Sequence, residues 1–527
     1  MIRLFLFLFF ISSFASVAQP WPFISGVGIF NSQSRSYGAV EVTGGYLVAG
    51  WSGLNPTGMD ATLMKLEPSG DTMWVKHYGG NAPDAGRSLV ASSDGYFAIA
   101  GNTASFGEGA DDMLLIKVDQ NGDTLFTRCY GGPLSDAAWN IRSIQYGAPG
   151  YILCGHTQSY GAGLKDIYLA RTDLNGSLLW TRSYGGVKNE EAYDVVETND
   201  KGFALTGYIE SLGADSSDLF VLKTDSTGNF EWMKRFGNNY DDYGRGIFQT
   251  ADSALIVAGY GKTGSIYEDS WMFKLSIDGN NMIWGKSYGG VQFDSFYDVI
   301  ALNDGGILAG GYTNCFGAGG QDAFIIRTDA NGDTLWTRTF GGPGCEEIYG
   351  MLETSNSGFI LASYEQSFDP MTQLSWLIKT DSNGFGPGCH ENGAAPVISV
   401  LNISENFITP FITLNNGVEG ITKFGINRGD HLDRFCSPGG LNDEPKQHSL
   451  VFPVPATDHC TVIFSLPVSE TSIFDIVDMS GRILQSLILE AGITELQIDL
   501  KPFSDGVLFL KNRTSHYPAP VRIILIK

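Results

Sequence analysis

The chain has 527 residues and a formal net charge of −24, a charge that nucleic acid and anionic membranes would repel. Hydrophobic residues make up 43% of the chain and aromatic residues 12%, which excludes a disordered glycine-rich protein despite the 67 glycines. Many glycines beside many aromatic side chains are typical of β-rich proteins with numerous tight turns.

The first 18 residues have the pattern of a secretory signal peptide. Arg3 precedes an apolar run from Leu4 to Phe14, and the small residues Ser16 and Ala18 predict cleavage after Ala18. The run is short for a membrane span, which disfavours the alternative of a membrane anchor, and no later stretch predicts a span. We therefore expect an exported protein that does not span the membrane. Some of its seven cysteines are expected to form disulfides, and their spacing contains no CxxC pair of a zinc site.

A repeat of about 52 residues fills the chain from residue 19 to residue 385. The sequence Tyr-Gly-Gly or a close variant recurs at Tyr78, Tyr130, Tyr184, Phe236, Tyr288 and Phe340. An aromatic residue stands four residues before each copy: Trp74, Phe126, Trp180, Trp232, Trp284 and Trp336. A cassette of Lys or Arg, an acidic residue and Gly precedes each aromatic residue. The period therefore indicates an array of equivalent structural units.

Each repeat holds four strand-like runs, which is the content of one β-propeller blade. The first strand occurs seven times, near Tyr37, Arg87, Trp139, Tyr193, Tyr243, Tyr297 and Tyr349. The seventh copy ends before its tryptophan strand, and the N-terminal stretch PWPFISGVG with Trp21 offers the missing piece. The sequence therefore predicts an all-β fold over residues 19–385: a seven-bladed β-propeller of four-stranded blades, its last blade closed by the N-terminal strand. We expect Trp21 and the repeated tryptophans to pack each blade against the next.

The stretch DANGDTLW, residues 329–336, is interpreted with its copies as the hairpin between the third and fourth strands. Asp and Asn bond their own backbone in turns, and Gly supplies a positive φ. The alternative is a calcium loop, although the Gly and Glu that an EF-hand needs at its sixth and twelfth positions are missing. The spacing also resembles the tryptophan-docking repeats of quinoprotein propellers and the Asp-box of sialidases, but departs from both by about one residue. We therefore expect no catalytic role and no cofactor here, with calcium as the open alternative.

Residues 386–440 break the repeat and are expected to form either an extended linker or extra strands on the propeller rim. Cys389 and Cys436 bracket this insert, and we expect a disulfide between them.

Residues 441–527 contain six strand-like runs, which predict a small antiparallel β-sandwich. The stretch FPVPATD, with Pro453 and Pro455, is similar to the opening of type IX secretion C-terminal sorting domains. The stretches IFDIVDMSGRIL, with Gly481, and IDLKPFSDGVLFLK, with Gly506, resemble later motifs of that family. The resemblance covers nearly all of residues 449–527. It implies an Ig-like fold and delivery by the type IX machinery of Bacteroidota, through the periplasm, to the outer cell surface or the medium.

Two sets of side chains are candidates for a binding face. An aspartate precedes the cassette Lys or Arg by five residues in six repeats: Asp60, Asp112, Asp166, Asp218, Asp269 and Asp322. Together with acidic residues after the Tyr-Gly-Gly loop, such as Asp241, these carboxylates are expected on one face, holding either a cation or carbohydrate or their own loops. The second set ends the second strands; Tyr208, Tyr260, Tyr312 and His156 are its candidate ligand-binding members, with core packing as the alternative.

No acid–base pair stands out from the repeats, and catalysis on a near-symmetric propeller needs a few unique residues. We therefore expect a non-catalytic propeller that binds an extracellular glycan or protein. The alternatives are an extracellular enzyme, either a polysaccharide hydrolase or lyase or a quinoprotein-like enzyme, and a structural surface protein.

Overall fold

The computed structural model describes residues 23–27, 33–55, 58–211, 216–262, 267–367, 373–386, 391–392, 397–401, 404–408, 411–415, 418–422, 426–427, 432–436, 449–452, 459–464, 472–478, 482–490, 495–502, 506–512 and 521–525. All regular elements within these ranges are β-strands. In this part of the chain no helix is long and apolar enough to cross a membrane. The chain forms two compact units, Met1–Pro438 and Gly439–Lys527.

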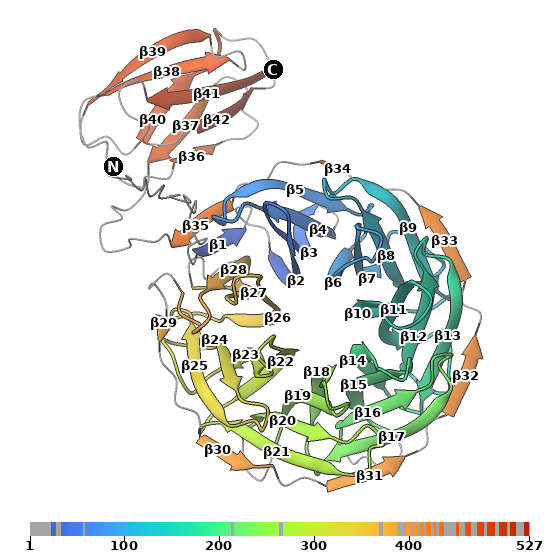
Figure 1. Ribbon diagram of the computed structural model, residues 1–527. Coiled ribbons are helices and arrows are strands. Elements are labelled where there is room, and N and C mark those ends of the chain that lie inside the picture. Colours follow the sequence, from blue (N-terminus) through green and yellow to red (C-terminus); the bar gives the residue numbers. More distant parts are fainter. Residues whose placement is uncertain are drawn as a thin grey trace, which may run out of the picture. The chain divides into compact units, whose positions relative to one another are not determined.

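Seven antiparallel sheets form the blades of a propeller, as Figure 1 shows. The first four blades contain, in chain order, β2 (Ser34–Val42), β3 (Gly45–Asn55), β4 (Gly58–Leu66) and β5 (Thr72–Tyr78); β6 (Asp84–Ala91), β7 (Phe97–Thr103), β8 (Asp112–Val118) and β9 (Thr124–Gly131); β10 (Asp136–Ser143), β11 (Gly150–Thr157), β12 (Asp166–Asp173) and β13 (Leu178–Gly185); β14 (Glu190–Glu197), β15 (Phe203–Ile209), β16 (Asp218–Thr224) and β17 (Phe230–Gly237).

Blades 5 and 6 follow the same order, and blade 7 contributes three consecutive strands. Their strands are β18 (Tyr243–Gln249), β19 (Leu255–Gly261), β20 (Asp269–Leu275) and β21 (Met282–Gly289); β22 (Asp294–Ala301), β23 (Ile307–Thr313), β24 (Asp322–Thr328) and β25 (Thr334–Phe340); β26 (Glu347–Glu353), β27 (Phe359–Glu365) and β28 (Leu374–Thr380). The predicted all-β fold with seven blades is confirmed.

The first strand of every blade lies innermost. Consecutive first strands contact one another around the ring, and β26 of blade 7 contacts β2 of blade 1. The hydrophobic core lies between neighbouring blades; Ile256 and Met272 of blade 5, for example, pack with Phe296 and Phe324 of blade 6. Because each blade buries its apolar faces only against its neighbours, stability depends on an unbroken ring.

The N-terminal strand β1 (Phe23–Val27) closes the ring by pairing antiparallel with β28. In the other blades the cassette Lys or Arg lies opposite the repeated aromatic residue, as Lys65 lies opposite Trp74. In blade 7 the register places Lys379 opposite Phe23. Phe23 therefore takes the place of the repeated aromatic residue in blade 7. Trp21 itself lies outside the described residues.

Seven described segments between Glu391 and Cys436 lie along the outer edge of the propeller, and we name them the belt. Seven short strands each add a fifth strand at the outer edge of one blade: β29 (Glu391–Asn392), β30 (Val397–Val400), β31 (Ser404–Ile408), β32 (Phe411–Asn415), β33 (Val418–Thr422), β34 (Ile426–Asn427) and β35 (Leu432–Cys436). The belt runs against the blade order, from blade 6 back to blade 1, and ends on β1 in blade 7 (Figure 1). The sequence left two alternatives for residues 386–440, an extended linker or extra strands on the propeller rim, and these strands correspond to the second. They occupy backbone groups that an open edge would expose.

The belt has its own period. Belt residues seven positions apart pair with equivalent basic residues of successive blades: Val400 with Lys286, Phe407 with Lys234, Leu414 with Arg182 and Ile421 with Arg128. Cys436 pairs with Ile24 of β1, whereas Cys389, its expected disulfide partner, lies outside the described residues. Cys129, Cys154, Cys315 and Cys345 are free.

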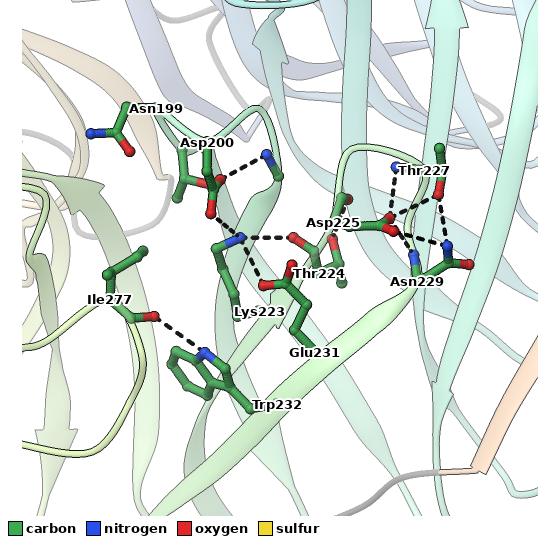
Figure 2. A network of polar contacts seen from close by, with 12 residues as sticks. Asn199, Asp200, Lys223, Thr224, Asp225, Thr227, Asn229, Glu231, Trp232 and Ile277 are labelled. Carbon is green, nitrogen blue, oxygen red and sulfur yellow. Dashed lines mark hydrogen bonds and ion pairs between the residues drawn. The ribbon is translucent and has the colours of Figure 1, made fainter.

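The Asp-x-x-Gly hairpins join each blade to the preceding one. In blade 4, one carboxylate oxygen of Asp225 accepts hydrogen bonds of 2.8 Å from the backbone N–H groups of Thr227 and Asn229, as Figure 2 shows. Gly228 has a φ of +75°, and a Cβ there would lie 2.8 Å from the Trp180 ring of blade 3. The glycine therefore meets two demands at once, a left-handed turn and close contact with the tryptophan.

The cassette lysine ties two hairpins of one blade together. Lys223 is 1% exposed, and its ammonium lies 2.9 Å from Asp200 and 3.2 Å from Glu231 (Figure 2). It also donates a hydrogen bond of 2.9 Å to the carbonyl oxygen of Thr224. Burial raises the pKa of Asp200, but hydrogen bonds from Thr198, Gly202 and Lys223 outweigh burial and hold that pKa below its usual value.

The C-terminal unit contains two antiparallel sheets. One has the order β36 (Ser449–Phe452), β37 (His459–Phe464), β40 (Glu495–Asp499); the other has the order β39 (Ile483–Leu489), β38 (Ser472–Asp478), β41 (Gly506–Asn512), β42 (Val521–Leu525). The side chains of Phe474, Ile476 and Ile498 are buried. Gly506 begins β41, whereas Pro453, Pro455 and Gly481 lie outside the described residues.

Candidate binding site at the propeller axis

A β-bulge near the start of each first strand presents one residue per blade around the axis. The bulges appear as register shifts between the first and second strands, for example between Ser36 and Gly38. We name the seven bulge residues the axial ring: Tyr37, Arg87, Trp139, Tyr193, Arg245, Tyr297 and Tyr349. The sequence located the fifth first strand near Tyr243, and β18 begins there. The bulge residue of this strand is Arg245, because the bulge falls between Gly244 and Gly246.

Each member of the axial ring contacts the next, and the seven contacts form a closed circle. The ring centroids of Tyr37 and Tyr349 are 4.8 Å apart, those of Tyr349 and Tyr297 are 5.3 Å apart, and those of Trp139 and Tyr193 are 5.8 Å apart. The two arginines complete the circle. All seven side chains are half-buried, so part of each remains open to solvent.

Each arginine of the axial ring lies between two aromatic rings. The Arg87 guanidinium is 5.0 Å from the centroid of Tyr37 and 4.9 Å from that of Trp139. The Arg245 guanidinium is 4.0 Å from Tyr193 and 5.1 Å from Tyr297. Such cation–π contacts hold the planar guanidinium in place while leaving its N–H edge available.

A second row of side chains lies beside the axial ring, at the ends of the second strands. It contains the four candidates from the sequence. Tyr208, Tyr312 and His156 are buried and Tyr260 is half-buried. Each contacts the axial residue of its own blade: Tyr208 packs on Tyr193, Tyr312 on Tyr297 and His156 on Trp139, and Tyr260 accepts a hydrogen bond of 3.0 Å from Arg245. The second row therefore supports the axial ring.

Glu191 is an acidic residue that the repeat does not predict. It is 4% exposed and lies at a first-strand position where other blades have Arg35, Ala85, Ala137, Tyr243, Ser295 and Glu347. Its carboxylate accepts hydrogen bonds from Trp139 Nε1 at 3.0 Å, Lys165 Nζ at 2.5 Å and the Tyr208 hydroxyl at 3.2 Å. His156 Nδ1 is 3.5 Å away.

These partners keep Glu191 ionised. Burial raises the pKa of Glu191, but His156 and Lys165 outweigh burial and hold that pKa at about 2. The carboxylate in turn fixes the Trp139 indole through the Nε1 bond. This cluster escaped sequence reasoning because Glu191 and Lys165 lie in different blades; the departure of His156 from the aromatic pattern was its one visible sign.

A related cluster surrounds Glu347 on the other side of the axis. Glu347 accepts hydrogen bonds from the hydroxyls of Tyr349 at 2.6 Å and Tyr364 at 3.2 Å. Arg35 donates to the Tyr349 hydroxyl at 2.9 Å and to the Gln373 side chain at 2.9 and 2.7 Å. Its guanidinium also lies 4.5 Å from the Tyr364 ring. The site therefore contains two ionisable clusters that break the sevenfold pattern.

Five of the six repeated aspartates begin a third strand, and Asp60 is the third residue of β4. Asp60, Asp112, Asp166, Asp218 and Asp322 are buried, and Asp269 is half-buried. Asp166, for example, accepts hydrogen bonds from the backbone N–H groups of Ala162 at 3.1 Å and Gly163 at 3.2 Å. Burial raises the pKa of Asp112, Asp166 and Asp269 to about 6. For Asp112, Asp166 and Asp322, these contacts correspond to the alternative in which the aspartate holds its own loop.

The carboxylates that follow the Tyr-Gly-Gly loop explain why the first position after the tyrosine must be glycine. A Cβ on Gly131 would lie 2.1 Å from Asp112 Oδ1 and 2.8 Å from Asp136 Oδ2, so a side chain cannot fit there. In the fourth copy this place belongs to Asp242, which accepts hydrogen bonds from the backbone N–H groups of Asn238 at 2.9 Å and Lys262 at 3.0 Å. The sequence placed Asp241 at this position, and the structure places Asp242 there. The residue that accepts the hydrogen bond lies four residues after the donor Asn238.

In the part of the chain that the structure describes, no group of three or more His, Cys, Asp or Glu side chains is arranged to hold a metal ion. In the hairpin of blade 6, Asp329 Oδ1 accepts hydrogen bonds from the backbone N–H groups of Asn331 at 2.8 Å and Asp333 at 2.9 Å. The Asp329 carboxylate therefore stabilises the turn of this hairpin through these two hydrogen bonds.

Comparison with known proteins adds to this picture at the C-terminus. Residues 450–527 match the family described as the secretion system C-terminal sorting domain. The C-terminal unit is a type IX sorting domain. The protein that carries this sorting domain is therefore exported through the type IX system to the cell surface or beyond.

A curated relative matches part of the chain. The regulatory protein FlaEY of Caulobacter vibrioides is 23% identical over 341 aligned residues, and the alignment covers 59% of the sorting-domain protein and 33% of the relative. The chain thus spans about a third of that relative's length.

Solved structures resemble the chain only loosely. A Bifidobacterium bifidum protein described as a candidate exo-β-1,3-galactanase is 12% identical with a TM-score of 0.26, and the alignment covers 49% of the sorting-domain protein and 89% of that chain. The extracellular domain of a candidate one-component system from B. thetaiotaomicron is 10% identical with a TM-score of 0.20, and the alignment covers 93% and 74%. These similarities are too weak to inform function.

Proposed function

We propose that this exported propeller is a non-catalytic binding protein that takes an extracellular glycan or protein at its axial ring. The proposal is carried by the closed circle of seven half-buried side chains, which presents five aromatic faces and two arginines. Aromatic and arginine side chains are the types that dominate binding energy at protein recognition sites.

The rigidity of the site supports this proposal. Trp139, Tyr193 and Tyr297 pack on the second-strand residues of their own blades, and every axial residue contacts its neighbours in the circle. Buried carboxylates hold the adjacent loops through backbone N–H groups. A site that is held in place before binding loses little conformational entropy when a ligand arrives.

The protonation of Glu191 favours binding over catalysis. Its pKa of about 2 lies far from neutral pH, so its carboxylate is a poor proton donor or acceptor there. The carboxylate is also occupied by three hydrogen-bond donors. The competing enzyme hypothesis rests on this same Glu191 cluster, and the hypothesis of a purely structural surface protein would leave the axial ring without a ligand.

Arrays of glycans and extracellular proteins, probed with purified residues 19–527, test the proposal. We expect specific binding that Trp139→Leu or Tyr297→Leu weakens at least tenfold. Tyr146→Leu and Tyr240→Leu are matched controls, because these tyrosines are about half exposed and lie outside the axial ring. The release of new reducing ends from a polysaccharide would overturn the non-catalytic assignment. Absence of all binding, or equal binding by the axial variants, would overturn the proposed site.

A further inference from the structure

We infer that the ligand of the axial ring is an acidic saccharide, a chain of sugars that carries carboxylate or sulfate groups. This inference rests on the proposed function and names the ligand class of the same site. It follows from two arginines that have no acidic partner and from the order of side chains around the circle.

Arg87 and Arg245 are the two cations of the axial ring. Some arginines elsewhere pair with carboxylates: Arg142 lies 2.9 Å from Asp194 and Arg235 lies 2.5 Å from Asp218. Within the described residues, Arg87 and Arg245 form no ion pair. In a chain of net charge −24, two such guanidinium groups at one site favour an anionic ligand.

The donors that remain free on these arginines suit an acid group. The hydrogen bonds of Arg87 within the described residues comprise one, of 2.7 Å, from a terminal nitrogen to the Tyr37 hydroxyl. Arg245 donates from a terminal nitrogen to the Tyr260 hydroxyl. Both acceptors are neutral hydroxyls, so the positive charge is not neutralised. The planar guanidinium can give two parallel hydrogen bonds to a carboxylate or sulfate.

The order of the circle points to a saccharide. Between Arg87 and Arg245 lie Trp139 and Tyr193, which contact each other edge to face at 5.8 Å. Two adjacent aromatic rings with a guanidinium on each side fit sugar rings that stack on the aromatic faces and carry acid groups at both flanks. The Trp139 indole is oriented by its bond to Glu191. The negative charge of Glu191 is countered by Lys165.

Isothermal titration of residues 19–527 with four probes tests the inference. The probes are a galacturonate trisaccharide, a sulfated galactose trisaccharide, neutral galactotriose and a poly-aspartate peptide. We expect one or both acidic saccharides to bind at least tenfold more tightly than galactotriose and poly-aspartate. Arg87→Gln and Arg245→Gln should each weaken acidic-saccharide binding at least tenfold, and added salt should weaken it as well.

Arg182→Gln is the matched control. Arg182 also stacks on an aromatic ring, 5.2 Å from the centroid of Trp180, but lies on the outer strand under the belt. Its loss should leave saccharide binding unchanged, and thermal melting of each variant checks the fold. The ligand class would be overturned if neutral galactotriose bound as tightly as the acidic probes, or if the arginine variants bound them as tightly as the parent protein does. Either result would leave the proposed function intact. Preference for poly-aspartate would replace the saccharide with a peptide, and failure of every probe together with blank arrays would overturn both proposals.

Discussion

The hydroxyl of Tyr184 donates a hydrogen bond of 2.6 Å to the carbonyl oxygen of Gly228, a residue of the next blade. The same tyrosine opens the Tyr-Gly-Gly motif of one repeat, and the glycine belongs to the turn motif of the following repeat. Equivalent bonds join Tyr78 to Gly122 at 2.8 Å and Tyr288 to Gly332 at 2.7 Å. The two most visible motifs of the sequence therefore form one joint between blades.

This joint predicts that Gly228→Ala destabilises the propeller more than an ordinary glycine substitution. Both Gly228 and Gly95 have positive φ, so alanine at either site costs about 1 kcal/mol of unfolding free energy. At Gly228 the new Cβ also meets the Trp180 ring, and such overpacking adds about 1–3 kcal/mol. Gly95→Ala is the matched control, because nothing lies within 4 Å of its Cβ position. Equal losses of unfolding free energy in chemical denaturation would contradict the joint.

The belt predicts a contrast between two truncations of the chain. A protein ending at residue 440 keeps all seven belt strands, whereas one ending at residue 385 exposes the outer edge of every blade. We expect the shorter protein to melt at a lower temperature and to aggregate through its open edges. Light scattering and thermal melting measure both effects. If the two proteins remain monomeric with the same melting midpoint, the belt does not stabilise the ring.

Buried carboxylates predict that stability falls as pH rises from about 4 to about 8. Burial raises the pKa of Asp242 to about 8, against about 3.9 for an unfolded aspartate. Its contribution to the free energy of unfolding is fully present below about pH 4 and is lost as pH rises through about 8. The raised pKa values of Asp112, Asp166 and Asp269 act in the same direction. We expect Asp242→Asn to flatten the decline of the melting midpoint between about pH 5 and pH 9.

Asp252 provides a control of opposite sign. Hydrogen bonds from Lys274 and Thr250 lower the pKa of Asp252 to about 2. Its contribution is present above about pH 4 and is lost as pH falls through about 2. Asp252→Asn should therefore leave the decline between pH 5 and pH 9 unchanged. A midpoint that rises with pH in the parent protein would contradict the prediction for Asp242.

The sorting domain predicts where a truncated protein accumulates. A chain that ends at residue 440 keeps the signal peptide predicted from its first 18 residues but lacks the matched residues 450–527. We expect it in the periplasm, while the full chain reaches the cell surface or the medium. Cell fractionation with an antibody against the propeller distinguishes the two. Surface delivery of the truncated chain would show that the domain is dispensable for export.

The repeat allowed the blades to be predicted because each copy carries its own turn residues and its own tryptophan. The closing strand was predicted too, but its register was not, since Phe23 rather than Trp21 lies opposite Lys379. The belt left a weak signal, four apolar residues seven positions apart. Its strands have two to five residues and pair with partners scattered over the whole ring, which no local pattern can reveal.

The axial ring escaped prediction for a geometric reason. A bulge adds one residue to the first strand and redirects its side chain, and bulges leave little trace in alternating patterns. Arg245 lies two residues after Tyr243, which made the tyrosine the more natural match to the other copies. The unpaired state of Arg87 and Arg245 became visible only when side chains from several blades were placed together.

The belt means that the number of blades is encoded twice in this chain. One count is made by long units of about 52 residues, and the other by the short belt strands, which run in the opposite direction and are spaced seven residues apart from Val400 to Ile421. Gain or loss of a blade by duplication or deletion would leave the belt one strand too short or too long. The evolution of ring size in this protein therefore requires two coordinated changes at distant places in the gene.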